Sequence, residues 1–174
     1  IQVATRVNGI GGLTNGGEAT SRGIEASLMF RPVAGLSLGL NGAWNDASLD
    51  EDFPTVFAPL GGGNELHLNT GLAGDPMPYV PDLTWSATAD YYVPLSGGWS
   101  ANYGAGFRWV DERSTGTTQR QVVVDATGAP VAEVITVAPV IDPYNVLDVY
   151  ASFSNEHWTL RAYMKNATDE RAYS

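Results

Sequence analysis

The chain has 174 residues, of which 44% are hydrophobic, and its 19 acidic and 9 basic side chains give a net charge of −10. This charge disfavours a nucleic-acid partner or an anionic surface, and the absence of cysteine excludes disulfides, thiolate metal sites and cysteine nucleophiles. The apolar residues alternate with polar ones and never form a run of about 18, so the sequence predicts no transmembrane helix.

Alternation of apolar and polar residues predicts β-strands along most of the chain, because successive side chains of a strand point to opposite faces. In the stretch IEASLMFR at 24–31, for example, Ile24, Ala26, Leu28 and Phe30 share one face. The same pattern recurs, and the expected strands are roughly 1–7, 18–31, 36–45, 79–93, 99–111, 143–153 and 158–168. The sequence therefore predicts an all-β protein.

Short and long connections join the expected strands. Tight turns rich in Gly, Pro, Asn and Ser are expected at 32–35, 94–98 and 154–157. Longer connections are expected at 8–17, 46–78 and 112–142. Alternating short and long connections predict an antiparallel up-and-down meander of about seven strands, whereas a Greek-key sandwich would not alternate in this way. We expect an open, curved sheet with 1–7 and 158–168 at its edges.

The two faces of the expected sheet differ in polarity, which is typical of a membrane barrel with lipid outside and water inside. The charged residues expected on the lumen-facing side are Glu25, Arg31, Asp90, Arg108, Asp148 and Arg161. The aromatic residues expected to form girdles at the membrane surfaces are Trp44, Tyr91, Trp99, Trp109, Phe153 and Trp158. Two alternatives remain: the apolar face lines the core of a soluble sandwich, and Arg108 and Arg161 belong to a structural charge network with Asp90, Asp148 and Glu25.

The sequence predicts no catalytic, cofactor or metal site, and hence no enzyme. The stretch GLSLG at 35–39 matches a nucleophile elbow, but Ser37 lies within a continuing strand and no helix follows. His67 and His157 do not have zinc-binding spacing. The acidic residues at 46–52 lack the spacing of a calcium loop, so we expect a solvated acidic connection. The glycines at 104 and 106 lie within a strand, where glycine relieves crowding or permits bending.

Five segments follow one another along almost the whole chain: EATSRGIEAS at 18–27, RPVAGL at 31–36, PMPYVP at 76–81, YNVLDV at 144–149 and WTLRAYMKNATDERAY at 158–173. In this order they resemble the carboxy-terminal part of the TonB-dependent outer-membrane receptors, transporters with 22-stranded barrels. The last segment resembles the family's N-L-x-D-x-x-Y motif, with Ala167 in place of the usual Leu and Tyr173 one place late. The resemblance implies that 1–174 is a partial barrel, strands fifteen to twenty-one, without the plug domain and the last strand.

The resemblance also implies a function: active import of a scarce ligand, such as a ferric siderophore, cobalamin or a glycan, across the outer membrane of a Gram-negative bacterium. The implied partners are outer-membrane lipid, a small-molecule ligand, and the inner-membrane TonB complex, which would act through the plug region. Because open sheet edges in hydrocarbon cost several kcal/mol for each unpaired group, we do not expect seven strands to span a bilayer alone. The alternative function is that of a secreted or surface β-sandwich module for adhesion or carbohydrate binding.

Overall fold

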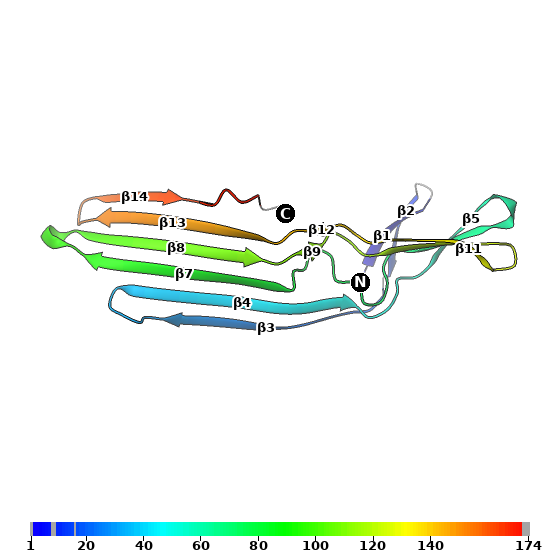
Figure 1. Ribbon diagram of the computed structural model, residues 1–174, viewed down its shortest axis with the longest axis horizontal. Helices are drawn as coiled ribbons and strands as arrows, with labels where there is room; N and C mark the ends of the chain where they lie inside the picture. Colours follow the sequence, from blue (N-terminus) through cyan, green and yellow to red (C-terminus); the bar gives the residue numbers. More distant parts are fainter. Residues whose placement is uncertain (1, 8–9, 16, 172–174) are drawn as a thin grey trace. The chain divides into compact units, whose positions relative to one another are not determined.

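The computed structural model describes residues 2–7, 10–15 and 17–171 and consists almost entirely of β-strands (Figure 1). Its contacts divide the chain into two compact units. One unit comprises 1–22, 45–80 and 113–141, and the other comprises 23–44, 81–112 and 142–174. None of the described residues forms a helix that is long and apolar enough to cross a membrane.

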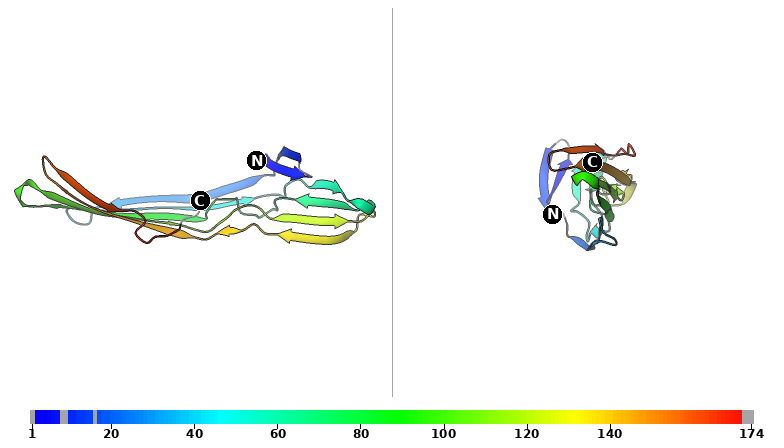
Figure 2. Two further views of the ribbon diagram at one scale, coloured as in Figure 1. Left: turned by 90° about the horizontal axis from the view of Figure 1, so that it is seen from above. Right: turned by 90° about the vertical axis from the view of Figure 1, so that its left-hand side faces the viewer.

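The second unit is built on a six-stranded sheet in the order β14-β13-β8-β7-β4-β3. The strands are β3 (Ala19–Phe30), β4 (Leu36–Leu49), β7 (Leu83–Pro94), β8 (Ser100–Val110), β13 (Tyr144–Ser154) and β14 (Thr159–Met164). Strands that follow one another in this sheet lie side by side (Figure 1), and the sheet is a single curved layer when seen from above (Figure 2). The expected antiparallel meander and open sheet are therefore confirmed.

The strand register separates two faces of different polarity. One row across β4, β7, β8 and β13 contains only apolar residues: Leu38, Ala89, Ala105 and Val149. The next row contains only small or polar residues: Gly39, Thr88, Gly106 and Asp148. Because neighbouring rows point to opposite sides of a sheet, the first row belongs to an apolar face and the second to a polar face. These names are kept below.

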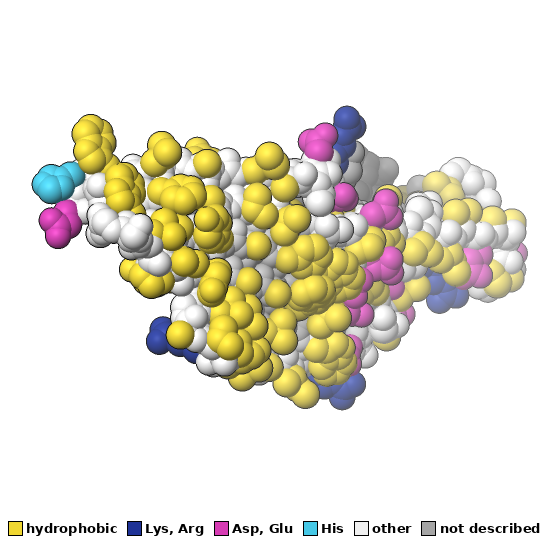
Figure 3. Space-filling view, turned by 60° about the vertical axis from the view of Figure 1, so that its left-hand side comes forward, with side chains coloured by type: hydrophobic (Ala, Val, Ile, Leu, Met, Phe, Trp, Pro, Cys, Tyr) yellow, Lys and Arg dark blue, Asp and Glu magenta, His cyan; other side chains and the backbone are white. Residues whose placement is uncertain are grey.

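The apolar face has no second layer packed against it among the described residues. The side chains of Ile24 and Leu28 are 70% and 56% exposed. Among the described residues of the six strands, the buried hydrophobic residues are Ala101 and Leu49, and Leu49 lies at the end of β4 that belongs to the first unit. Hydrophobic side chains accordingly cover much of the surface in view in Figure 3. A soluble sandwich would bury these side chains between two layers, so the fold argues against that alternative.

The first unit consists of the longer connections. A four-stranded sheet has the order β11-β10-β6-β5, with β5 (Val56–Pro59), β6 (Glu65–Asn69), β10 (Gln119–Val124) and β11 (Pro130–Thr136). Two further pairs are β1 (Gln2–Val7) with β2 (Ile10–Asn15) and β9 (Arg113–Ser114) with β12 (Val140–Ile141). A single 3₁₀ turn, η1 (Gly61–Gly63), lies between β5 and β6 of this unit. A second one, η2 (Ser96–Gly98), lies in the other unit, in the turn between β7 and β8.

Asp75 joins two connections that are distant in sequence. One carboxylate oxygen accepts hydrogen bonds from the backbone N–H groups of Leu72 at 3.0 Å and Thr118 at 2.7 Å. The other accepts one from the Thr118 hydroxyl at 2.7 Å. Beside this contact, Phe53 and Leu49 are buried against Gly71, where a Cβ atom would lie 2.7 Å from Phe53 Cδ2. The hydrogen bonds of Asp75 thus join the connection at 46–78 to the one at 112–142 beside a small apolar cluster.

Two predictions from the sequence are wrong. The segment 2–7 is not an edge of the six-stranded sheet, because it pairs with Ile10–Asn15 in a local hairpin and β3 forms that edge instead. A local partner requires closure of only a short loop, which costs little entropy. The connections 46–78 and 112–142 are not plain loops, because β5, β6, β10 and β11 pair within them. Such pairing supplies hydrogen-bond partners to backbone groups that a long connection must otherwise leave to water.

Three strand ends also differ from expectation, and one of them is the end of β4, which was expected at 45 and lies at Leu49. The strand expected from 79 begins at Leu83, and the strand expected to 168 ends at Met164. Tyr79, with φ 63°, and Asn166, with φ 49°, adopt the left-handed conformation, which ends a strand. The tight turn at 32–35 is confirmed, and Gly35 supplies its positive φ of 82° beside the Tyr92 carbonyl.

Candidate functional site

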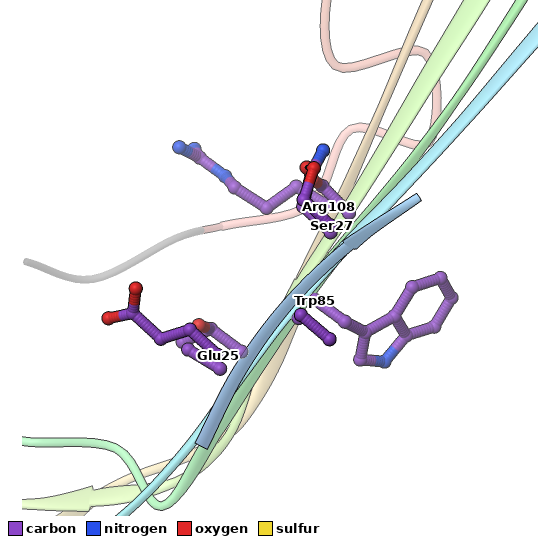
Figure 4. A pocket seen from close by; sticks show the side chains of 10 residues that line it. Glu25, Ser27, Trp85 and Arg108 are labelled. Carbon is purple, nitrogen blue, oxygen red and sulfur yellow. The ribbon is translucent and has the colours of Figure 1, made fainter. Parts of the chain in front are cut away.

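The polar face of the six-stranded sheet is the candidate functional site, because it gathers most of the charged residues expected to act. Figure 4 shows the side chains of Glu25, Ser27 and Arg108 on one side of the sheet and the ring of Trp85 on the other. Alternation along β7 explains this arrangement, since Trp85 pairs with Trp109 and the neighbouring Ser86 pairs with Arg108. The strand register thus brings Arg108 to the same face as Glu25.

A first hollow on this face lies over β3, β4, β7 and β8. Glu25, Ser27, Asn41, Ser86 and Arg108 are among its lining residues (Figure 4). The Ser27 hydroxyl donates a hydrogen bond to Asn41 Oδ1 at 2.7 Å, which joins β3 to β4 on this side. The hollow therefore offers one carboxylate, one guanidinium and several neutral hydrogen-bonding groups to water or to a ligand.

A second hollow lies over β7, β8, β13 and β14 and has a volume of about 650 Å³. It brings together three of the predicted residues: Asp90, Asp148 and Arg161. Asp148 Oδ1 accepts a hydrogen bond from the Asn166 N–H at 2.8 Å. Hollows of this size accommodate small organic ligands. Of the six predicted lumen-facing residues, Arg31 lines neither hollow and lies just past the end of β3.

Tyr150 reaches across β8 to join β13 to β7. Gly104 pairs with Tyr150 on one side and with Asp90 on the other. The Tyr150 hydroxyl donates a hydrogen bond to Asp90 Oδ1 and accepts a weaker one from Asn102 Nδ2 at 3.4 Å. A Cβ atom at Gly104 would overlap the Tyr150 ring. Glycine is therefore required at position 104 if the ring is to lie flat across the strand.

The arginines of the polar face form no direct ion pair with another described residue. The ion pairs between described residues are Arg22–Asp46, Glu65–His67 and Arg120–Glu133. Arg108 and Arg161 take part in none of them. Neither arginine therefore forms a direct ion pair with Asp90, Asp148 or Glu25 within the described part of the chain.

The acidic residues at 46–52 form hydrogen bonds with residues more than 20 positions away in the chain, and Asp46 lies within β4. Asp46 pairs with Arg22 at 2.8 Å, Asp50 accepts a hydrogen bond from the Thr20 hydroxyl at 2.7 Å, and Asp52 accepts one from the Ala73 N–H at 2.7 Å. Within the described part of the chain, no group of three or more His, Cys, Asp or Glu side chains is arranged to hold a metal ion.

Asp125 closes the turn between β10 and β11. Its Oδ1 accepts hydrogen bonds from the Thr127 hydroxyl at 2.6 Å, the Thr127 N–H at 2.8 Å and the Ala129 N–H at 3.1 Å. These bonds, the Thr127 hydroxyl first, lower the pKa of Asp125 below its ordinary value. The charged carboxylate therefore stabilises the turn above the unfolded-state pKa of about 3.9, and this stabilisation is lost as the pH falls through the lower folded-state pKa.

Replacing Thr127 with valine is expected to raise the pKa of Asp125 towards its ordinary value, because the largest cause of the shift is removed. An NMR titration of the Asp125 carboxyl carbon in the parent and T127V proteins measures both values. A parent carboxyl that titrates at or above the ordinary value contradicts the expectation, as does a T127V carboxyl with an unchanged pKa.

Sequence reasoning missed one contributor to the polar face, Tyr150. Tyr150 received no role, although it lies two residues after Asp148 and therefore shares its face. Gly104 was expected to relieve crowding, and it does so for the Tyr150 ring. At Gly106 a Cβ atom would meet nothing within 4 Å, so crowding does not explain that glycine, and the alternative that it permits bending stays a prediction. Strand parity could have placed Tyr150, but only the register shows which glycine its ring covers.

Comparison with known proteins gives one match. The model of the family described as TonB dependent receptor-like, beta-barrel, matches residues 1–167. No curated protein and no solved structure matches the chain. The family match covers nearly the whole length and agrees with the open antiparallel sheet and its two unlike faces. The chain belongs to the TonB-dependent receptor-like β-barrel family.

Proposed function

We propose that this chain is part of the barrel of an outer-membrane transporter that imports a scarce ligand with energy from the inner-membrane TonB complex. The six strands of its main sheet would correspond to strands sixteen to twenty-one of the barrel, because the segment expected as strand fifteen pairs elsewhere. The ligand would be of the ferric siderophore, cobalamin or glycan class. The family to which the chain belongs consists of transporters, not enzymes.

The observation that carries this proposal is the pair of unlike faces on a single-layered sheet. A row such as Leu38, Ala89, Ala105 and Val149 has no protein layer over it in the described residues, and lipid would cover it in a membrane. β7 has 12 residues and β8 has 11, which is the length that a tilted strand needs to cross a bilayer. Trp85 and Trp109 pair directly at one end of these strands, where a membrane-surface girdle is expected.

The polar face would then line the water-filled lumen. Glu25, Arg31, Asp90, Arg108, Asp148 and Arg161 are the residues that we propose to face it. Arg108 and Arg161 would attract an anionic ligand, because neither guanidinium group is neutralised by an ion pair with another described residue. A charged side chain in a water-filled lumen avoids the cost of burial in hydrocarbon, which is consistent with five of the six charges lying along these strands.

The full-length protein that carries this sequence provides the test. We expect it to fractionate with the outer membrane, and we expect its deletion to abolish uptake of one ligand when ferric siderophores, cobalamin and glycans are tested separately. Loss of the inner-membrane TonB complex is expected to abolish the same uptake. Recovery of the full-length protein in the soluble fraction would refute the proposal, and so would uptake that persists without the energy complex.

A further inference from the structure

Two glycines on β8 face the polar side, and a side chain covers one of them but not the other. Gly104 lies under the Tyr150 ring, whereas a Cβ atom at Gly106 would meet nothing within 4 Å. Both lie on the same face, since they are two residues apart on one strand. Gly106 therefore leaves an uncovered stretch of backbone at the bottom of the second hollow, which it lines together with Asp148 and Tyr150. This uncovered stretch of backbone is called the floor of the hollow below.

Tyr150 shows what fits on such a floor. Its ring lies flat across Gly104, between two strands that are each about 4.8 Å from β8, and its hydroxyl donates to the Asp90 carboxylate. A glycine floor with a carboxylate on a neighbouring strand thus accepts a phenol ring in this protein. The same elements are present two rows along, on the same face, at Gly106, where the row is completed by Thr88 on β7 and Asp148 on β13.

The Gly106 row has room for such a ring. The Thr88 hydroxyl leans over β4, because a Cβ atom at Gly39 would lie 2.6 Å from Thr88 Oγ1, and Thr88 therefore leaves Gly106 clear. Asp148 uses Oδ1 to accept the Asn166 N–H, and its second oxygen has no hydrogen bond from a described residue. Tyr150 and Tyr163 also line the hollow and offer aromatic contact to a bound ring.

We propose that the hollow over Gly106 binds an aromatic ring that bears a hydroxyl group, carried by a small ligand. The ring lies on Gly106 beside Tyr150, and its hydroxyl donates a hydrogen bond to the Asp148 carboxylate. This inference rests on the proposed function in one respect: the polar face must be reached by a ligand from water. It adds a ligand chemistry and a binding position that the family assignment does not supply.

The test uses the full-length receptor in detergent and two probes that differ only by one hydroxyl, N-acetyltyrosinamide and N-acetylphenylalaninamide. Calorimetric titration is expected to show about tenfold tighter binding of the tyrosine probe, since a hydrogen bond to a charged acceptor contributes at least that much. Gly106→Ala is expected to weaken binding of the tyrosine probe about tenfold, because its methyl group lifts the ring from the floor.

Matched variants separate this effect from a general loss of structure. Gly42→Ala is the control, since a Cβ atom there makes only ordinary contacts of 3.7 Å and 3.8 Å and Gly42 lies in the row of Trp85 on the apolar face. It is expected to leave binding unchanged. Asp148→Asn keeps an acceptor for the Asn166 N–H and is expected to reduce the preference between the probes to about threefold or less.

Equal affinity for the two probes overturns the inference, and so does undiminished binding to the Gly106→Ala protein. Probe binding in detergent is measured separately from membrane insertion and ligand uptake, so the two proposals can fail independently. A receptor that inserts and imports but does not distinguish the probes contradicts only this inference. A receptor that binds the tyrosine probe as expected but remains soluble contradicts only the proposed function.

Discussion

An arginine at position 89 is expected to destabilise the membrane-inserted sheet by about 2–4 kcal/mol, the cost of arginine on the lipid-facing side of a barrel near the bilayer midplane. Ala89 lies on the apolar face midway along β7, opposite Leu38 and Ala105. Neither neighbour offers the guanidinium group a polar partner, and hydrocarbon would cover it. Urea unfolding of the full-length receptor in lipid vesicles measures the change.

The neighbouring residue is the matched control. Thr88 lies on the polar face, where its direct partners on both sides are glycines, Gly39 and Gly106. Thr88→Arg therefore places the same charge one residue away with room around it and access to water. It is expected to change stability by about 1 kcal/mol or less. Equal destabilisation by the two arginines would contradict the assignment of the faces, and greater destabilisation at position 88 would reverse it.

The faces could be predicted from the sequence because they depend only on strand parity. Ser86, Thr88 and Asp90 share a side of β7 whatever their partners are, and Trp85, Ala87 and Ala89 share the other. The turn at 32–35 was also predictable, since Gly35 supplies a backbone conformation that other residues rarely adopt. The meander, the tight turns and the polar face were therefore predictable from residue patterns within single strands and turns.

Pairing between distant segments could not be predicted in the same way. β6 and β10 pair Leu68 with Gln121, more than 50 residues apart in the chain, and the short stretches involved carry a weak alternating signal. The hairpin of β1 with β2 likewise competes with the expected pairing of β1 to the main sheet. The contact of Tyr150 with Gly104 depends on register and on side-chain direction, which the order of residues along a strand does not specify.

Alanine at position 104 is expected to destabilise the folded receptor by about 3–5 kcal/mol. Its Cβ atom would overlap the Tyr150 ring, and relieving such overpacking costs about 1–3 kcal/mol. The displaced hydroxyl also leaves Asp90, and a hydrogen bond to a charged group contributes about 1.5–3 kcal/mol. Gly106→Ala, two residues along the same face, is the matched control and is expected to be nearly neutral, because its Cβ atom meets open space.

A double-mutant cycle isolates the contact between the two positions. If the Tyr150 ring is the reason for glycine at 104, then Gly104→Ala becomes nearly neutral in a Tyr150→Ala protein, and the coupling energy equals the whole cost of Gly104→Ala, about 3–5 kcal/mol. Tyr150→Phe removes only the hydroxyl and is expected to cost about 1.5–3 kcal/mol, because Asp90 loses its donor. Urea unfolding in lipid vesicles provides all of these values. Additive effects of the two alanine substitutions would show that the ring does not depend on Gly104, and Tyr150 would then not join β7 to β13 across β8.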